Sequence, residues 1–239
     1  MKIAILGYGR MGKIIEKLAL KANHEIVYKT SGKIDEKALQ KADVAIEFSI
    51  AEAAFKNIST CFENNIPVVS GTTGWLKDYE KTINLCKEKN GSFLYASNFS
   101  VGVNLFFTLN KKLAKMMDNQ SEYQLEMEEI HHTKKRDAPS GTAITLAEGI
   151  IANSHKTNWK LVKNHKEKIP SEIIPITAKR LEDVKGTHKV EYKSEIDSIE
   201  IKHTAYSREG FAKGAILAAE FIADKKGIFN MQDVLQNII

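Results

Sequence analysis

Over the first hundred residues, short continuous apolar runs alternate with segments in which apolar residues recur at helical spacing. Short apolar runs lie at 2–6, 25–29, 43–49, 66–70 and 92–97. Runs of this length are typical of strands that are buried on both faces of a parallel sheet. Helical segments follow at 51–65 and 75–89, and the first helix is indicated by apolar residues at helical spacing: Met11, Ile14, Ile15, Leu18, Ala19 and Ala22. Alternating strands and helices predict an α/β fold with a Rossmann-type parallel sheet.

The pattern changes near residue 100. After a predicted helix at 103–118, three segments alternate apolar and polar residues one by one, at 123–129, 188–194 and 198–205. Such alternation is typical of an open mixed or antiparallel sheet with one face in water. The stretch 153–175 is polar and holds two of the four prolines, so a long loop is predicted there. A last helix at 208–224 could return the chain to the first domain.

The composition is that of an ordinary globular protein, with 43% hydrophobic and 27% charged residues among 239. The net charge of +5 suits acidic small molecules, whereas the absence of a basic stripe studded with aromatic residues argues against nucleic acid. No apolar run approaches the roughly 18 residues of a membrane span, and the N-terminus does not resemble a signal peptide. Cys61 and Cys86 have no metal-like spacing, which favours inert thiols and a cytoplasmic location.

Three glycines in the motif GYGRMG, namely Gly7, Gly9 and Gly12, follow the first predicted strand and open the first helix. In that context the first glycine permits a tight turn, the second lets a pyrophosphate approach the backbone, and the third allows close packing of helix on strand. The helix N-terminus also attracts an anion. The motif therefore predicts dinucleotide binding, with a merely structural turn as the alternative.

The choice between NADH and NADPH depends on the end of the second strand. The acidic residue that usually contacts the ribose 2′-hydroxyl about 20 positions after the glycines is missing, and the segment YKTSGK contains Lys29 and Lys33. A lysine at this place could hold a 2′-phosphate, which points to NADP. Alternatively, both lysines could be solvated loop charges.

Two further turns follow predicted strands. The segments SGTTG (70–74) and ASNFS (96–100) come after the fourth and fifth strands. Ligands of open parallel sheets bind at the carboxyl ends of the strands. Gly71, Thr72 and Thr73 are therefore expected to line the nicotinamide side of the cofactor, and a plain glycine-rich turn is the alternative.

The stretch EIHHTKKRDAPSGTA (129–143) gathers groups that suit an anionic substrate. His131 and His132 are followed by three consecutive cations at 134–136, and a helix begins near Ser140. Crowded cations are costly unless an anion offsets them, and the first amides of a helix form an anion nest. The combination of cations, helix N-terminus and a proton donor predicts a small polyanionic substrate.

The residues of this region also suggest a metal site or a glycosidase pair. Adjacent histidines in an extended segment point to opposite faces, and no Cys, Asp or further His stands at ligand spacing nearby, so no metal is predicted. Glu126 and Glu128 share one strand face and could imitate a glycosidase pair, but a solvated strand face explains them.

These motifs resemble the dihydrodipicolinate reductase family. The segments GYGRMG, SGTTG, SNFSVGVN, EIHHTKKRDAPSGTA and IEIKHTAYSREGFAKGA occur in the family's order and span nearly the whole chain. The resemblance implies reduction of 4-hydroxy-tetrahydrodipicolinate to tetrahydrodipicolinate by NADPH or NADH, with loss of water, in lysine and diaminopimelate synthesis. It also implies a homotetramer, a dinucleotide-binding domain at 1–100 and 209–239, and a smaller α+β domain with an open mixed sheet at 101–208 for substrate binding and oligomerisation.

Roles for single residues are implied by the same resemblance. His131 is similar to the family's proton donor and acceptor, and Lys135 to a second proton donor. His132, Gly141 and Thr142 resemble contacts to substrate carboxylates. The implied cofactor contacts are Gly7, Tyr8, Gly9, Arg10, Met11, Gly12, Lys29, Gly71, Thr72, Thr73, Ala96, Ser97, Asn98 and Phe99.

The chain departs from the family pattern in two places. Lys29-Thr30 stands where an acidic or Glu-Arg pair is often found, which leaves the cofactor preference open. The family's Arg-x-Gly-Asp-x-x-Gly-x-His stretch appears as RLEDVKGTH, with Glu182 in place of glycine. We expect this change to affect the local turn but not the active-site chemistry. Another small nicotinamide reductase would not explain HHTKKRDAPSGT, and a non-catalytic NADP sensor would give His131 and Lys135 no role.

Overall fold

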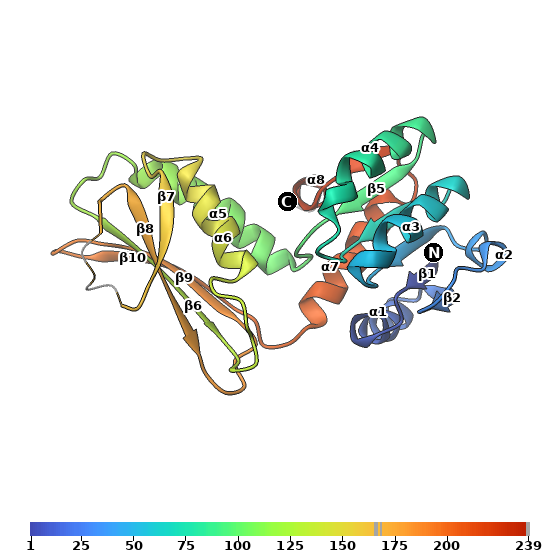
Figure 1. Cartoon of the computed structure of the whole chain (residues 1–239), viewed down its shortest axis with the longest axis horizontal. Coiled ribbons are helices and arrows are strands. Elements are labelled where there is room, and N and C mark those ends of the chain that lie inside the picture. The colour runs from blue at the N-terminus through green and yellow to red at the C-terminus, as the bar shows by residue number, and fades with distance from the viewer. Residues whose placement is uncertain (165–166, 168, 238–239) are drawn as a thin grey trace. The chain divides into compact units, whose positions relative to one another are not determined.

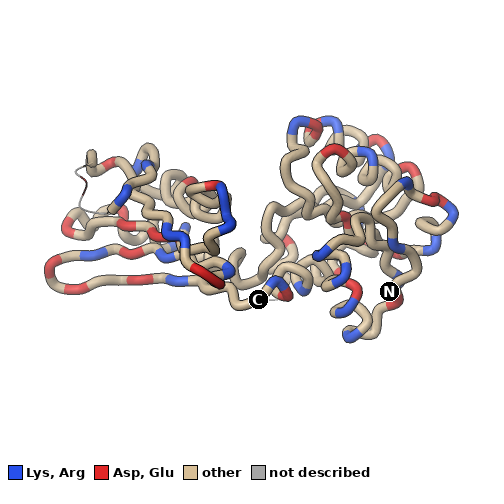
Figure 2. Tube along the Cα trace, turned by 60° about the horizontal axis from the view of Figure 1, so that its bottom comes forward, with Lys and Arg blue, Asp and Glu red and all other residues tan. Residues whose placement is uncertain are grey.

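The structure, a computed structural model, describes residues 1–164, 167 and 169–237. Two compact units share the chain, one made of Met1–Val101 with Arg208–Ile239 (unit 1) and one of Gly102–Ser207 (unit 2). Each unit has its own sheet, shown in Figure 1. Basic and acidic residues are interspersed along the trace of both units (Figure 2), so the net charge of +5 is spread over the chain. Among the described residues, no helix has the length and hydrophobicity to cross a membrane.

Unit 1 is built on a six-stranded parallel sheet in the order β11-β5-β4-β3-β1-β2. The strands are β1 (Lys2–Leu6), β2 (Glu25–Thr30), β3 (Val44–Glu47), β4 (Val68–Ser70), β5 (Ser92–Tyr95) and β11 (Gly227–Phe229). The central strands are short and apolar because helices cover both faces. One face packs on α1 (Arg10–Lys21), α7 (Glu209–Ile222) and α8 (Met231–Gln236), and the other on α2 (Glu36–Leu39), α3 (Ala51–Glu63) and α4 (Tyr79–Glu88). The short 3-10 helix η1 (Leu76–Asp78) directly precedes α4.

Unit 2 contains a five-stranded mixed sheet in the order β10-β9-β6-β8-β7. The strands are β6 (Gln124–His131), β7 (Asn158–Val162), β8 (Ile173–Arg180), β9 (Thr187–Lys193) and β10 (Ser198–Thr204). The helices α5 (Val101–Met117) and α6 (Gly141–Ile151) lie side by side on one face (Figure 1). Leu125, Met127 and Val190 are buried on that face, which forms the core of the unit.

The predicted fold class, a Rossmann-type parallel sheet with a second unit on a mixed sheet, is confirmed. The predicted loop at 153–175 is wrong, because β7 lies inside it and β8 begins at Ile173. Most residues of β7 are exposed or half-buried, so this edge strand lacks the strict alternation that marks a strand in a sequence. Residues 165, 166 and 168 of that predicted loop lie outside the described residues.

Candidate active site

The glycine turn after β1 has the backbone shape that a dinucleotide requires. Gly7 has φ +98°, in a region that side chains disfavour, and a Cβ added at Gly12 would lie 2.6 Å from the carbonyl oxygen of Gly7. Apart from Gly9 and its chain neighbours, none of the described residues has an atom within 4 Å of the place a Cβ would take on Gly9, so the backbone faces open space there. Helix α1 begins after Gly9 without a side-chain cap, which leaves its first amides for an anion. These residues fit a pyrophosphate.

The turns after β4 and β5 are shaped by two aromatic rings. A Cβ on Gly71 would lie 2.2 Å from the ring of Phe48, so any larger residue here would have to displace that ring. The rings of Phe48 and Phe99 pack with their centroids 5.7 Å apart, and Phe99 is buried. Gly71 and Phe99 therefore shape this edge of the sheet through packing, whereas Thr73 and Ser97 are exposed there.

A buried carboxylate organises the same edge. Glu47 is fully buried at the end of β3 and accepts hydrogen bonds from the hydroxyls of Ser49, Ser70 and Thr72, the last two at 2.7 and 3.0 Å. A buried carboxylate needs such donors. The Thr72 hydroxyl is thus engaged within the protein. Sequence analysis overlooked Glu47, although a single acidic residue in the apolar run VAIEF was a usable signal.

Lys29 is paired with an acidic residue that sequence analysis did not consider. Its Nζ lies 2.6 Å from Oε1 of Glu16 and 4.5 Å from the centroid of the Tyr8 ring. The Tyr8 hydroxyl donates to the other oxygen of Glu16. The hydrogen bond to Glu16 raises the pKa of Lys29, so the lysine stays charged, but Glu16 offsets that charge. Lys33 is exposed.

The stretch 129–143 forms the end of β6, a turn and the start of α6. His131 lies on the buried face of β6 and is 8% exposed. The hydroxyl of Ser140 caps α6 by accepting from the Ala143 amide at 3.2 Å. Gly141 and Thr142 are the first two residues of α6, so their amides have no partner within the helix. This geometry offers two donors to a carboxylate.

The cations that follow the histidine pair do not act as one group. Nζ of Lys135 contacts both carboxylate oxygens of Asp137, at 2.7 and 2.8 Å, and its side chain is largely shielded from solvent. Lys134 and Arg136 are exposed. His132 is half-buried, and its Nδ1 is a buried atom that makes no hydrogen bond. Lys135 is therefore the cation of this turn that is placed for a specific contact.

Glu129 gathers the groups around His131. It is fully buried on the same face of β6, where its Oε1 accepts from Nη2 of Arg180 and its Oε2 from the amide of Ser140, both at 2.9 Å. Nδ1 of His131 lies 3.4 Å from Oε2, within ion-pair distance but without hydrogen-bond geometry. Burial raises the pKa of Glu129, but the hydrogen bonds from Ser140 and Arg180 outweigh it and hold the pKa below its usual value. Because Glu129 uses the Ser140 amide, the predicted anion nest begins at Gly141.

The stretch RLEDVKGTH supplies three groups to this cluster, although Glu182, the residue that departs from the family pattern, is not one of them. Besides Arg180, it places Gly186 so that an added Cβ would lie 3.2 Å from Nε2 of His131. It also places the ring of His188 edge-on to that of His131, with centroids 5.0 Å apart. The positive φ of its turn falls on Asp183, at +59°, and not on Glu182, which explains why glycine is not required at 182.

Protonation of the two histidines is set mainly by burial. Burial lowers the pKa of His131, Glu129 opposes this, and Lys135 and Arg180 lower it further. Burial also lowers the pKa of His188 to about 3, so that ring is neutral at physiological pH.

Glu129, His131 and His188 bring three ligand-type atoms within 4.8 Å of one another. Although no further histidine stands at ligand spacing in the sequence near His131, the fold brings His188 next to it. The carboxylate, however, already accepts from Arg180 and Ser140, and the nearby guanidinium would repel a divalent cation. The arrangement favours a hydrogen-bonded network over a metal site.

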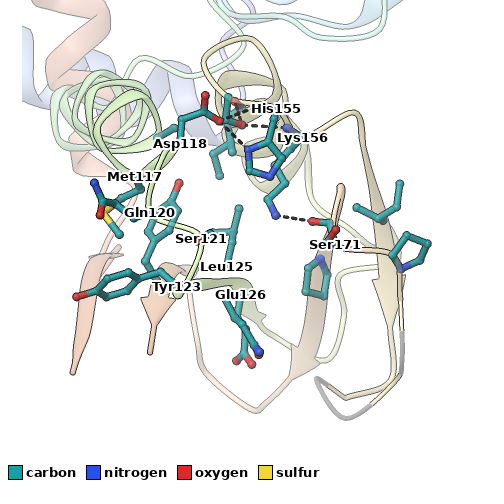
Figure 3. A pocket seen from close by; sticks show the side chains of 18 of the residues that line it. Met117, Asp118, Gln120, Ser121, Tyr123, Leu125, Glu126, His155, Lys156 and Ser171 are labelled. Carbon is teal, nitrogen blue, oxygen red and sulfur yellow. Dashed lines mark hydrogen bonds and ion pairs between the residues drawn. The ribbon is translucent and has the colours of Figure 1, made fainter. Parts of the chain in front are cut away.

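A cavity of about 850 Å³ lies elsewhere in unit 2 (Figure 3). It is lined in part by Asp118, Tyr123, Lys156 and Ser171, and the Lys156 ammonium donates to the carbonyl of Ser171 at 2.5 Å. His155 pairs with Asp118 at its rim, as the dashed lines of Figure 3 show. None of the predicted site residues lines this cavity, so it is separate from the cluster around His131.

Comparison with known proteins gives matches over the whole length. Residues 1–99 match the family model described as dihydrodipicolinate reductase, N-terminus, and residues 102–235 match the model of its C-terminus. A 4-hydroxy-tetrahydrodipicolinate reductase from Christiangramia forsetii is 54% identical, covering 100% of this chain and 99% of the relative. One from Methanocaldococcus jannaschii is 39% identical over 82% of this chain and 72% of the relative.

A solved structure supports the fold. The dipicolinate-bound dihydrodipicolinate reductase from Paenisporosarcina sp. TG-14 superposes with a TM-score of 0.77 at 23% identity, covering 100% of this chain and 99% of that one. The match to a full-length relative at 54% identity and the matches to both family models show a sequence similarity that a shared fold alone would not produce. The chain therefore belongs to the dihydrodipicolinate reductase family and is an oxidoreductase, as its motifs predict.

Proposed function

We propose that this chain reduces 4-hydroxy-tetrahydrodipicolinate to tetrahydrodipicolinate with NADPH or NADH, and that His131 supplies the proton. The observation that carries this proposal is the position of His131, a buried imidazole between the carboxylate of Glu129 and the side-chain-free Gly186. The relatives named 4-hydroxy-tetrahydrodipicolinate reductase support the substrate. They also support a place in lysine and diaminopimelate synthesis.

The residues around His131 have the chemistry that the reaction needs. A bound nicotinamide cofactor supplies the hydride. Loss of the 4-hydroxyl group as water first leaves a carbon–carbon double bond conjugated with the ring imine. Hydride addition at C4 then moves electron density onto the conjugated system and the ring nitrogen, and a nearby acid must provide a proton. The His131 imidazole is the proposed acid, and Lys135 the second donor. His132 and the amides of Gly141 and Thr142 are the proposed contacts to the substrate carboxylates.

A direct assay tests the proposal. The protein is mixed with NADPH or NADH and with the freshly prepared product of dihydrodipicolinate synthase, and loss of the reduced cofactor is followed by absorbance. Rapid oxidation that depends on both protein and substrate is expected. If the cofactor binds but is not oxidised, the chain is a nicotinamide sensor and the reductase proposal fails.

Cofactor choice gives a second test. We propose that NADPH binds at least as well as NADH at low salt, and that the difference shrinks as salt screens Lys29. Since Glu16 offsets the charge of Lys29, Glu16→Gln should improve the preference for NADPH by up to about fivefold, the range of an exposed ion pair. Lys29→Ala should reduce it. Fluorescence titrations with both cofactors at two ionic strengths measure this.

The matched control for the cofactor titrations is Lys33→Ala, which removes an exposed lysine from the following loop. It should leave the ratio of the two affinities unchanged. A clear preference for NADH at both salt concentrations would contradict the role given to Lys29.

Assembly and location are proposed from the same resemblance. We expect a homotetramer formed through unit 2, in which residues 101–208 serve substrate binding and oligomerisation, and a cytoplasmic enzyme. Light scattering should then give a mass near four times 26.8 kDa. A monomer at micromolar concentration would count against the tetramer and would leave the proposed reaction untouched.

A further inference from the structure

We propose that Glu129 is a positioning residue of the reaction, which holds His131 in the tautomer and orientation that present Nε2 as the proton donor. This inference rests on the proposed role of His131. The role of Glu129 goes beyond the proposed function, because its carboxylate acts on the His131 imidazole and not on the substrate.

The Glu129 carboxylate is fixed on both sides. Arg180 holds Oε1 from the end of β8, and the Ser140 amide holds Oε2 from the start of α6. Oε2 therefore cannot turn away from Nδ1 of His131, from which it is 3.4 Å distant. Catalytic hydrogen bonds are often long before substrate binds and tighten in the complex.

The neighbour of each ring nitrogen decides which one releases the proton. An ionised carboxylate can only accept a hydrogen bond, so Glu129 favours a proton on Nδ1 of His131. Nε2 lies beside Gly186, which has no side chain. In the imidazolium both nitrogens carry protons. The Nε2–H bond breaks as the bond to the substrate forms, its electron pair stays on Nε2, and the neutral Nδ1–H form remains beside Glu129, which stays ionised.

Charged and titratable groups from four elements surround His131. Glu129 lies on the same strand, Lys135 and Asp137 in the following turn, and Arg180 and His188 on the neighbouring strands. Lys135 and Arg180 disfavour the imidazolium, whereas Glu129 and the more distant Asp137 favour it. Nε2 of the neutral His188 lies 2.9 Å from the Ser140 hydroxyl and 3.8 Å from Oε2 of Glu129, so it is farther from that oxygen than Nδ1 of His131 is, at 3.4 Å.

The variant Glu129→Gln removes the charge and keeps the shape and the acceptor. Loss of the negative charge should lower the pKa of His131, so the rate should begin to fall at a lower pH as pH rises. We expect the descending limb of the kcat–pH profile to move to lower pH by about one unit. At pH values above that limb, kcat should be about tenfold lower than in the wild type, and KM should change little. Glu128→Gln is the matched control. It removes the next carboxylate along the strand, which pairs with Lys179, and it should keep the wild-type profile.

Nitrogen NMR of the ¹⁵N-histidine-labelled wild-type protein tests the inference without turnover and without a variant. The neutral His131 ring, assigned with His131→Asn, should carry its proton on Nδ1. A ring that carries it on Nε2, or a Glu129→Gln profile that matches the wild type, would overturn the proposal. If the wild type has no reductase activity while the Nδ1–H form is present, the proposed function fails and the positioning of His131 by Glu129 stands.

Discussion

Replacement of His131 by alanine is expected to lower kcat by roughly 10²-fold, the low end for loss of a general acid, and to leave KM little changed. The reason is that the imidazole acts on the reacting system, whereas other groups hold the substrate carboxylates. Steady-state rates over a range of substrate concentrations separate the two parameters. Cofactor affinity should not change, because the glycine turn that fits the dinucleotide lies in unit 1.

The control for this variant is His155→Ala, which removes an exposed histidine that pairs with Asp118. It should keep wild-type turnover. Circular dichroism and the cofactor titration verify that both variants are folded. Near wild-type turnover in folded His131→Ala would rule out the stretch 129–143 as the catalytic centre.

Replacement of Lys135 by alanine should lower kcat and raise KM together, with a combined loss in kcat/KM of roughly 10³- to 10⁴-fold. The change removes a proton donor, worth about 10²-fold or more, and a charge-assisted hydrogen bond worth about 1.5–3 kcal/mol. In the structure its Nζ is held by Asp137 at 2.7 Å, so the lysine is already oriented within the turn. A substrate carboxylate would replace or share that contact.

Inhibition by pyridine-2,6-dicarboxylate, a planar dianion, measures the binding part separately. The compound should compete with substrate, and its inhibition constant should rise in Lys135→Ala. Lys115→Ala, a change at an exposed lysine of α5, is the control for loss of one positive charge. If Lys135→Ala lowers kcat alone and leaves inhibition unchanged, the lysine donates a proton without holding a carboxylate.

Local sequence patterns predicted five of the six strands of unit 1 and its longer helices, because these signals lie within a few consecutive residues, but they missed the short elements α2, β11 and α8. The partners of His131 come from elsewhere. Strand register places Arg180 opposite His131 and His188 opposite Glu129. The register between strands some 50 residues apart cannot be inferred from a local sequence pattern. The positions of Arg180 and His188 beside His131 could therefore not be predicted from the sequence.

The burial of Glu129, in contrast, could have been predicted from the sequence. The alternation in β6 that buries Leu125 and Met127 continues by two residues to Glu129 and then His131. An acidic residue on the buried face of a strand, two positions before a histidine, was therefore a usable signal. Glu16 was harder to find, because its contact with Lys29 joins a helix face to the end of a neighbouring strand.

The buried pairing of Glu129 with Arg180 also constrains how this sequence can change during evolution. Arg180 is partly exposed and also donates to the carbonyls of Lys179 and Asp137, so it keeps partners if Glu129 is lost. Loss of Arg180 alone, in contrast, would leave the fully buried Glu129 carboxylate without its ion-pair partner, at a cost of about 3–5 kcal/mol, a large share of the stability of a typical domain. Substitution of Arg180 is thus strongly disfavoured while Glu129 is present, so the guanidinium is expected to persist wherever the acid does.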